Sequence, residues 1–213
     1  GSGSLTNFSG SNLSDSDFAG VTAHKLKFNG SALRGSDFSG ADLTGSLFMG
    51  SDVSEAIFDG ADLTDCILSA SNLTGASFRK ALLLCTEFNA SDLKSAKFSG
   101  VELIGARIIK TDLRETTFEN CLFNKVDFKY SDLRGLNLGG NTFIDIRFNK
   151  AALDGASFSG ATLKNVSFQP TFALTNKYYR AIATICFDEA MMDKLTYATL
   201  KGVGADLSKV AVI

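Results

Sequence analysis

The chain has 213 residues and 45% of them are hydrophobic, so one domain of ordinary size can bury a sizeable core. The net charge of −2 at pH 7 argues against strong general attraction to nucleic acid or acidic membranes. The charge is uneven, because residues 1–65 carry nine acids and three bases, whereas residues 66–169 carry ten acids and 13 bases. The four cysteines include no Cys-x-x-Cys pair, which excludes the usual zinc and disulfide spacings.

Residues 1–5 begin with Gly-Ser-Gly-Ser and are interpreted as an expression tag or a disordered start. A repeat region follows over residues 6–170. In it, an apolar residue recurs at every fifth position, without insertion, from Phe8 to Phe168. Of these 33 positions, which we call rungs, 30 are Leu or Phe. A fixed short period predicts a solenoid, in which each repeat buries its apolar face against its neighbours.

Each unit shows the same polarity pattern around its rung, position i. Position i−2 is mostly small, position i−1 is often Asp or Asn, and position i+2 is Gly in 15 of the 33 units. Successive side chains of extended backbone point to opposite faces, so i and i−2 should point inward and i−1 and i+1 outward. Glycine at i+2 fits a corner, because it accepts positive φ cheaply. The pattern predicts a chain wound into a tube.

The consensus (Ala/Ser)-(Asp/Asn)-(Leu/Phe)-x-Gly resembles the pentapeptide-repeat family, A(D/N)LXX, over residues 6–170. The resemblance implies an all-β solenoid, a right-handed quadrilateral β-helix with four units per coil, and 33 units then make about eight coils. Rungs twenty apart share a side. We number the four sides by the rungs Phe28, Leu33, Phe38 and Leu43. Phe predominates on the first and third sides, so Phe is expected to face Phe across the core.

Residues 171–213 depart from the ladder and are expected to include a short α-helical segment. Thr175 or Asn176 can cap its first helix. An apolar stripe at helical spacing follows, made of Tyr178, Ile182, Ile185 and Cys186. A second short helix is expected over residues 188–195.

Two roles for this helical segment stay open. The helices either cap the open end of the tube, which would otherwise expose rungs and unpaired backbone, or interrupt the ladder as an insertion. Residues 198–202 and 205–209 again resemble repeat units in a shifted register, which favours partial extra coils after the helices.

The sequence offers no constellation that would support catalysis or hold a cofactor or metal, so we predict that this segment is not an enzyme. The single histidine, His24, stands at an outward position with no nucleophile or base partner evident in the sequence. The glycine spacing is the period of the fold and contains no phosphate-binding loop. Cys66 and Cys121 occupy i−2 positions and are interpreted as small core fillers.

On the second side, a base follows an acid by two residues in three successive coils. The pairs are Asp92 with Lys94, Asp112 with Arg114, and Asp132 with Arg134. We interpret them as an ion-pair ladder that relieves the stacking of like charges. The alternative is a basic stripe for an acidic partner.

Apolar residues at outward positions of the fourth side are a second candidate site, because the repeat normally places polar residues there. They are Leu82, Leu84, Ile104, Leu122 and Ile144. A contiguous exposed apolar patch usually marks a contact. Either the C-terminal helix folds back onto this patch, or a protein partner binds it.

We therefore predict a non-catalytic protein–protein interaction module, a rigid scaffold that binds a partner along one face. By analogy, it could be the domain of a bacterial secreted effector, such as a HECT-like E3 ubiquitin ligase, that recruits substrate or host proteins. The alternative implied by the family is a DNA mimic that binds gyrase or topoisomerase and gives quinolone protection, with dimerisation through a C-terminal helix. The expected location is the bacterial cytoplasm, or a host cell if the protein is secreted. Direct nucleic-acid binding is not expected, because the net charge is −2. A membrane span is not expected either, since no apolar run approaches ~20 residues.

Overall fold

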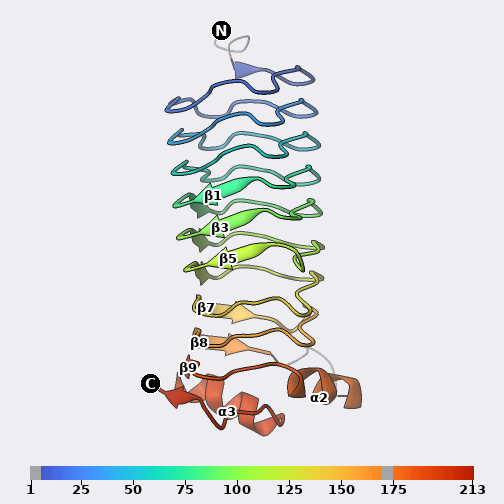
Figure 1. Ribbon diagram of the computed structural model, residues 1–213, viewed down its shortest axis with the longest axis vertical. Coiled ribbons are helices and arrows are strands. Elements are labelled where there is room, and N and C mark those ends of the chain that lie inside the picture. Colours follow the sequence, from blue (N-terminus) through green and yellow to red (C-terminus); the bar gives the residue numbers. More distant parts are fainter. Residues whose placement is uncertain (1–5, 169–174) are drawn as a thin grey trace.

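The computed structural model describes residues 6–168 and 175–213. It is a stack of coils with the N-terminus at one end and two helices, α2 (Asn176–Ala183) and α3 (Lys194–Gly202), at the other (Figure 1). Residues 1–5 and Pro170, where the sequence predicts a tag and the end of the ladder, lie outside the described residues.

Residues twenty positions apart pair in parallel on every side of the solenoid. Examples from the first to the fourth side are Lys27 with Leu47, Asp52 with Asn72, Asp37 with Ile57, and Asp42 with Asp62. Because each unit has five residues, this register puts four units in each coil.

Two parallel sheets lie on adjacent sides of the tube. The sheet on the third side has the order β1 (Ser77–Arg79), β3 (Lys97–Ser99), β5 (Thr117–Glu119). The sheet on the fourth side has the order β10 (Ala211–Val212), β9 (Met191–Met192), β8 (Thr162–Ser167), β7 (Thr142–Arg147), β6 (Leu122–Asn124), β4 (Glu102–Ile104), β2 (Leu82–Leu84). From Leu82 onward, the fourth side is therefore a continuous ribbon of short strands.

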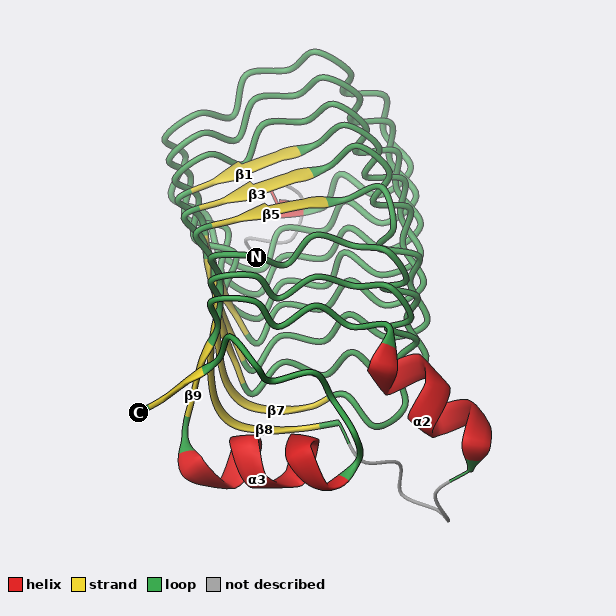
Figure 2. Cartoon of the chain, turned by 60° about the horizontal axis from the view of Figure 1, so that its bottom comes forward, coloured by secondary structure: helices red, strands yellow, loops and turns green. Residues whose placement is uncertain are grey.

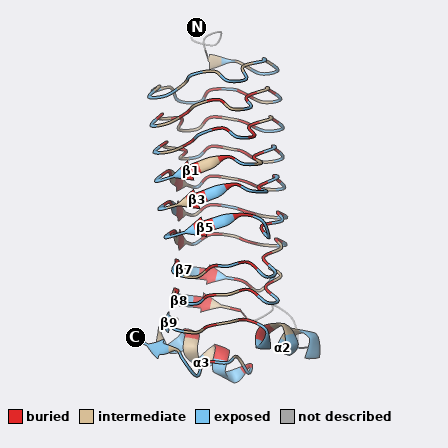
Figure 3. Ribbon diagram, viewed as in Figure 1, coloured by how far each residue is buried: buried red, intermediate tan, exposed pale blue. Residues whose placement is uncertain are grey.

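The rungs form the core, as the five-residue period predicts. Every rung from Phe28 to Phe168 is buried, and buried positions alternate with outward ones along each coil (Figure 3). Phenylalanines of one side stack along the axis, for example Phe38 on Phe58 with ring centroids 5.1 Å apart. The first and third sides meet edge to face, as where Phe38 and Phe48 lie 5.7 Å apart at 87°. The expectation that Phe faces Phe is confirmed.

The small residues at i−2 do more than fill space. On the second side, the Ser51 and Ser71 hydroxyls each donate to a rung carbonyl of the previous coil, Phe28 and Phe48, at 2.5 Å. The same bond recurs at Ser31, Ser91, Thr111 and Ser131. These buried hydroxyls give the carbonyls a second hydrogen-bond partner, so the coils are joined through the core as well as through the sheet.

Most corner positions have positive φ whether or not they hold glycine, with Glu115 and Lys150 as exceptions among the described residues. Within the ladder 15 non-glycine residues adopt it, including Lys80 and Cys85, both at 54°. The corner N–H donates to a carbonyl one coil further on, as from Lys80 to Ser99 at 2.8 Å. Hydrogen bonding between coils therefore offsets the backbone strain that a side chain introduces at this position.

The helix α2 interrupts the ladder. Thr175 caps it, as predicted, with its hydroxyl accepting from the N–H of Tyr178 at 3.3 Å. The Thr184 hydroxyl just after the helix accepts from Gly155 N–H at 2.7 Å. Phe187 then stacks on Phe158 at 5.6 Å, although 29 positions separate them instead of twenty. Of the two roles left open by the sequence, α2 fits the insertion.

The helix α3 lies at the end of the tube beside β8 (Figure 2). Thr196 and Asp193 accept from the N–H groups of Val166 and Asn165, at 3.1 and 3.0 Å. Leu200 is buried on the side that faces the core. This helix therefore satisfies polar groups of β8 and fits the cap.

The second predicted helix was misplaced. Residues 188–195 contain β9, and Met191 pairs with Thr162 as a further coil on the fourth side. The interpretation of residues 198–202 as a repeat unit is also wrong, because they belong to α3. At 205–209 the ladder does return, since Leu207 is buried and Glu189 N–H donates to Lys209 at 3.0 Å.

Thiol reactivity offers a direct check of this burial. Cys66 and Cys121 are buried, and burial raises their thiol pKa to about 12 and about 11, whereas Cys85 is exposed at a corner. Since the thiolate is the reactive form, we expect a disulfide reagent to label Cys85 in the native protein and to reach Cys66 and Cys121 only in denaturant. The Cys85→Ser variant is the control and should lose the Cys85 labelling. Native labelling of Cys66 would contradict the structure.

Candidate protein-binding surfaces

The apolar patch lies on four consecutive strands of the fourth side. Leu84 pairs directly with Ile104, and the same column continues through Asn124 to Ile144. Leu82 and Leu122 stand in the neighbouring column, separated by Glu102. All five apolar residues named from the sequence are half-buried. The structure thus places them on one face, interrupted by Glu102 and Asn124.

The C-terminal helices do not cover this patch. The helix α3 packs against β8, and both helices lie beyond the coils that carry β2, β4 and β6 (Figure 1). The alternative that the helix folds back onto the patch is wrong. The physical reason is that α3 replaces part of a coil at the end of the tube and is tied there by its hydrogen bonds to β8.

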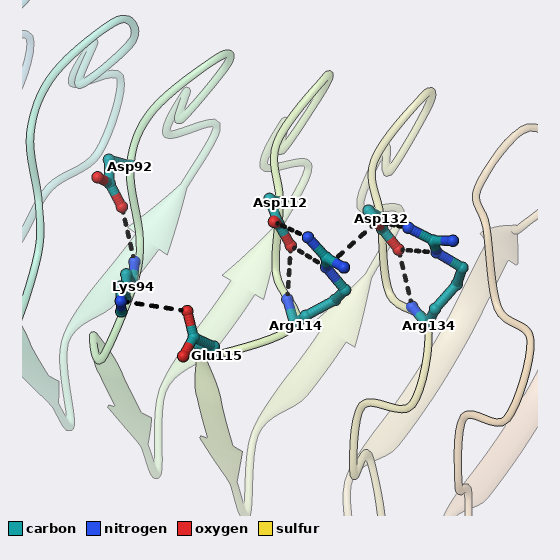
Figure 4. A network of polar contacts seen from close by, with 7 residues as sticks. All are labelled: Asp92, Lys94, Asp112, Arg114, Glu115, Asp132 and Arg134. Atoms are coloured by element: carbon teal, nitrogen blue, oxygen red, sulfur yellow. Dashed lines mark hydrogen bonds and ion pairs between the residues drawn. The ribbon is translucent and has the colours of Figure 1, made fainter.

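The charged residues of the second side form a chain of contacts along the axis (Figure 4). The Arg114 guanidinium contacts Asp112 at 2.7 Å and reaches Asp132 on the next coil at 3.3 Å, while Arg134 contacts Asp132 at 2.8 Å. Lys94 differs, because its ammonium lies 3.6 Å from Glu115. Asp92 instead accepts from the backbone N–H of Lys94 at 3.0 Å. Lys94 and Arg114 therefore each reach an acid on the next coil, and Lys94 pairs with Glu115 and not, as predicted, with Asp92.

These contacts shift the acid–base properties of the carboxylates. The hydrogen bond from Arg114 lowers the pKa of Asp112 to about 2, and Arg134 likewise lowers the pKa of Asp132. A carboxyl group with a lowered pKa in the folded state stabilises the fold above its unfolded pKa, near ~4. That contribution is lost as the pH falls from about 4 through about 2. Asp112 and both arginines are exposed to solvent and Asp132 is half-buried, so the contribution to stability is small.

The Arg114→Gln variant tests the network through this pKa. We expect the pKa of Asp112 to rise toward the ordinary value of ~3.9, because the charged donor is gone. Carboxyl-carbon NMR titration measures it. Arg34→Gln, which removes the Arg34 contact with Glu55 at 3.3 Å on the same side, should leave Asp112 unchanged. A wild-type Asp112 that titrates near the ordinary value would exclude the contact in solution.

Sequence reasoning missed the partner of His24. Its Nε2 lies 2.7 Å from Asp42 Oδ2 on the next coil, and this hydrogen bond lowers the pKa of Asp42 to about 2. The spacing could have predicted this contact. His24 follows rung 23 and Asp42 precedes rung 43 of the next coil, and such positions are always 18 residues apart. A pair on an open face without a nucleophile has no evident catalytic role.

Within the described ranges, no cluster of three or more His, Cys, Asp or Glu side chains is arranged to hold a metal ion. None of the described helices is long and apolar enough to cross a membrane.

Comparison with known proteins identifies the repeat. A model of pentapeptide repeats (8 copies) matches residues 4–40, 31–69 and 131–169, and a model of a pentapeptide repeat region matches residues 71–146. Both models describe repeats and indicate no catalytic family. No curated protein matches the chain.

Several solved structures are similar to this chain. A trypsin-treated variant of QnrB1, a plasmid-mediated fluoroquinolone resistance protein, is 17% identical with a TM-score of 0.59, covering 97% of this chain and 98% of that one. Full-length QnrB1 is 15% identical with a TM-score of 0.55, covering 92% and 95%. HetL from the cyanobacterium Nostoc is 19% identical over 87% and 90%, with a TM-score of only 0.40. At these identities the likeness to the two QnrB1 structures shows the fold alone. With family models matching most of its length, the chain belongs to the pentapeptide-repeat family.

Proposed function

We propose that the chain is a non-catalytic scaffold that binds a protein partner along its fourth side. The observation that carries the proposal is the patch of Leu82, Leu84, Ile104, Leu122 and Ile144 at outward positions of consecutive coils. When a partner removes apolar side chains at such positions from water, the free energy of the complex falls relative to the separate proteins.

The rigidity of the face supports this proposal. Each coil is hydrogen-bonded to the next through the sheet, and on the second side also through buried hydroxyls. A face held in this way loses little conformational entropy when a partner docks. The half-burial of the five side chains also fixes them in place before binding.

Introducing negative charge into the patch tests the proposal. We expect a Leu84→Asp, Ile104→Asp double variant to lose the proteins that the wild type captures in a quantitative pull-down. The matched control is Thr44→Asp with Thr64→Asp, at the same outward column of earlier coils, and it should retain them. Thermal melts of both variants establish that the fold is kept. Capture of the same proteins by the Leu84→Asp, Ile104→Asp variant would overturn the proposal.

A second candidate is a DNA mimic that binds gyrase or a related topoisomerase and protects it from quinolones. The likeness in fold to QnrB1 over 97% of the chain favours it, as does the net −6 charge of residues 1–65. The basic excess of residues 66–169 disfavours it. A gyrase supercoiling assay with a fluoroquinolone tests this role. Supercoiling that the chain restores in the presence of the drug supports the role. A chain that neither inhibits gyrase nor protects it from the drug rules the role out.

A further inference from the structure

A basic groove lies beside the apolar patch, around the corner from the fourth side to the first. It has a volume of about 430 Å³, and its basic lining residues are Lys125, Lys129, Arg147 and Lys150. Two acids, Asp127 and Asp145, also line it, which leaves a formal net charge of +2. The groove thus concentrates positive charge in a chain whose net charge is −2.

The acids of the groove are already engaged. Asp127 Oδ2 lies 3.6 Å from the Lys129 ammonium, and Asp145 Oδ1 accepts from the Asn165 amide at 2.8 Å. Lys125 and Arg147 are exposed, and neither forms an ion pair within the part of the chain that the structure describes. Two unpaired cations facing one groove repel each other, and an anion bound between them would relieve that repulsion.

The groove is continuous with the patch through the backbone. Strand β7 carries Ile144 of the patch and Arg147 of the groove, with the corner residue Asp145 between them. One coil earlier, Leu122 begins β6 and Lys125 follows this strand directly. A ligand that covers the C-terminal half of the patch therefore meets positive charge when it passes the corner.

We infer that the partner docks on the fourth side with apolar side chains and places an adjoining run of acidic residues in this groove. The inference rests on the proposed function and adds the chemistry of the partner. An acidic protein segment fits better than a nucleic acid. The basic surface is short, and a long polyanion running along the tube would meet the net −6 charge of residues 1–65.

Fluorescence anisotropy with synthetic probes tests the inference. The main probe is a labelled peptide with a Leu-Ser half and an all-Glu half. Its sister peptides replace Glu by Gln, or Leu by Ser, and oligothymidylate of similar length is the nucleic-acid probe. The groove variant is Lys125→Glu with Arg147→Glu. Its matched control is Lys80→Glu with Lys97→Glu, two exposed bases of the third side with the same change in net charge.

We expect the Leu–Glu peptide to bind the groove variant about tenfold more weakly than the wild type, and to bind the control within about twofold. The Gln peptide should also bind about tenfold more weakly, and added salt should remove most of this difference. Equal affinity for the groove variant and the wild type would overturn the inference. So would tighter binding of oligothymidylate, or no binding of any probe.

The patch is tested separately with Leu122→Ser and Ile144→Ser. If these changes and the Leu-to-Ser peptide both weaken binding, the patch and the groove act on one ligand, as inferred. If they leave the affinity unchanged while the groove variant weakens it, docking on the fourth side is overturned and only acidic recognition remains. The failure of the proposed function is thereby distinguished from the failure of the groove.

Discussion

Replacing Phe98 by alanine should lower the free energy of unfolding by about 3–5 kcal/mol. Phe98 is fully buried, with ring centroids of Phe78 and Phe118 at 4.6 and 4.9 Å on either side along the axis. It also meets Phe88 edge to face at 5.8 Å. The neighbouring coils are held by their own hydrogen bonds, so they cannot collapse far into the cavity that the substitution leaves. Chemical denaturation followed by circular dichroism measures the loss.

Phe8→Ala is the matched control for this rung. Phe8 is half-buried in the first coil and stacks on Phe28 from one side only, at 5.2 Å. In a solenoid each repeat is stabilised by its neighbours, so an end rung should cost less than a central one, about 1–2 kcal/mol. Equal losses at Phe8 and Phe98 would show that the core is not built as a stack of coils.

Most of the fold could be predicted because the repeat is a physical constraint on every unit. For the chain to turn a corner every five residues, one large and one small inward residue must alternate with polar outward residues in each unit. The rungs from Phe28 onward are buried, in agreement with this requirement. The number of sides was implied by the family and not by the pattern. Pairing at a spacing of twenty residues, as between Asp52 and Asn72, supplies it.

The C-terminal segment was harder to predict because an insertion breaks the register. The unit around Phe187 fits the repeat, yet its offset from Phe158 is 29, so a search at a fixed spacing passes over it. The apolar stripe predicted for the first helix also extended beyond the end of α2 at Ala183. Ile185 follows the end of α2 and occupies a buried i−2 position, where periodicity alone cannot separate a helix from a coil.

The candidate sites were predictable as positions but not as contacts. Outward apolar residues could be assigned to one side from their numbering. That Lys94 would reach Glu115 depends on side-chain length and corner geometry, which the repeat does not encode. The basic groove was missed because Lys125 and Arg147 belong to different sides and meet only at the corner. The assignment to a secreted effector, its location and a dimer through the C-terminal helix stay predictions.

Asn141→Ala should lower the free energy of unfolding by about 2 kcal/mol. Asn141 is a buried i−2 residue whose amide donates to the carbonyls of Phe118 and Leu138, each at 3.1 Å, and whose oxygen accepts from Cys121 N–H at 2.8 Å. Alanine leaves these three backbone groups without the partner they have now, in a place that water does not reach. Denaturant unfolding compared with the wild type measures the cost.

Asn124→Ala is the control, because the buried Asn124 Oδ1 accepts no hydrogen bond from any described residue. Its loss removes an unsatisfied oxygen and should cost under about 1 kcal/mol. A loss below about 0.5 kcal/mol at Asn141 would contradict the prediction. It would mean that a backbone hydrogen bond within the coil replaces the Asn141 side chain. The coil of Ala61 has such a bond, from Ala61 N–H to the Phe58 carbonyl at 3.0 Å. A loss near 2 kcal/mol would instead show that the neighbouring coils prevent the backbone from forming this replacement hydrogen bond.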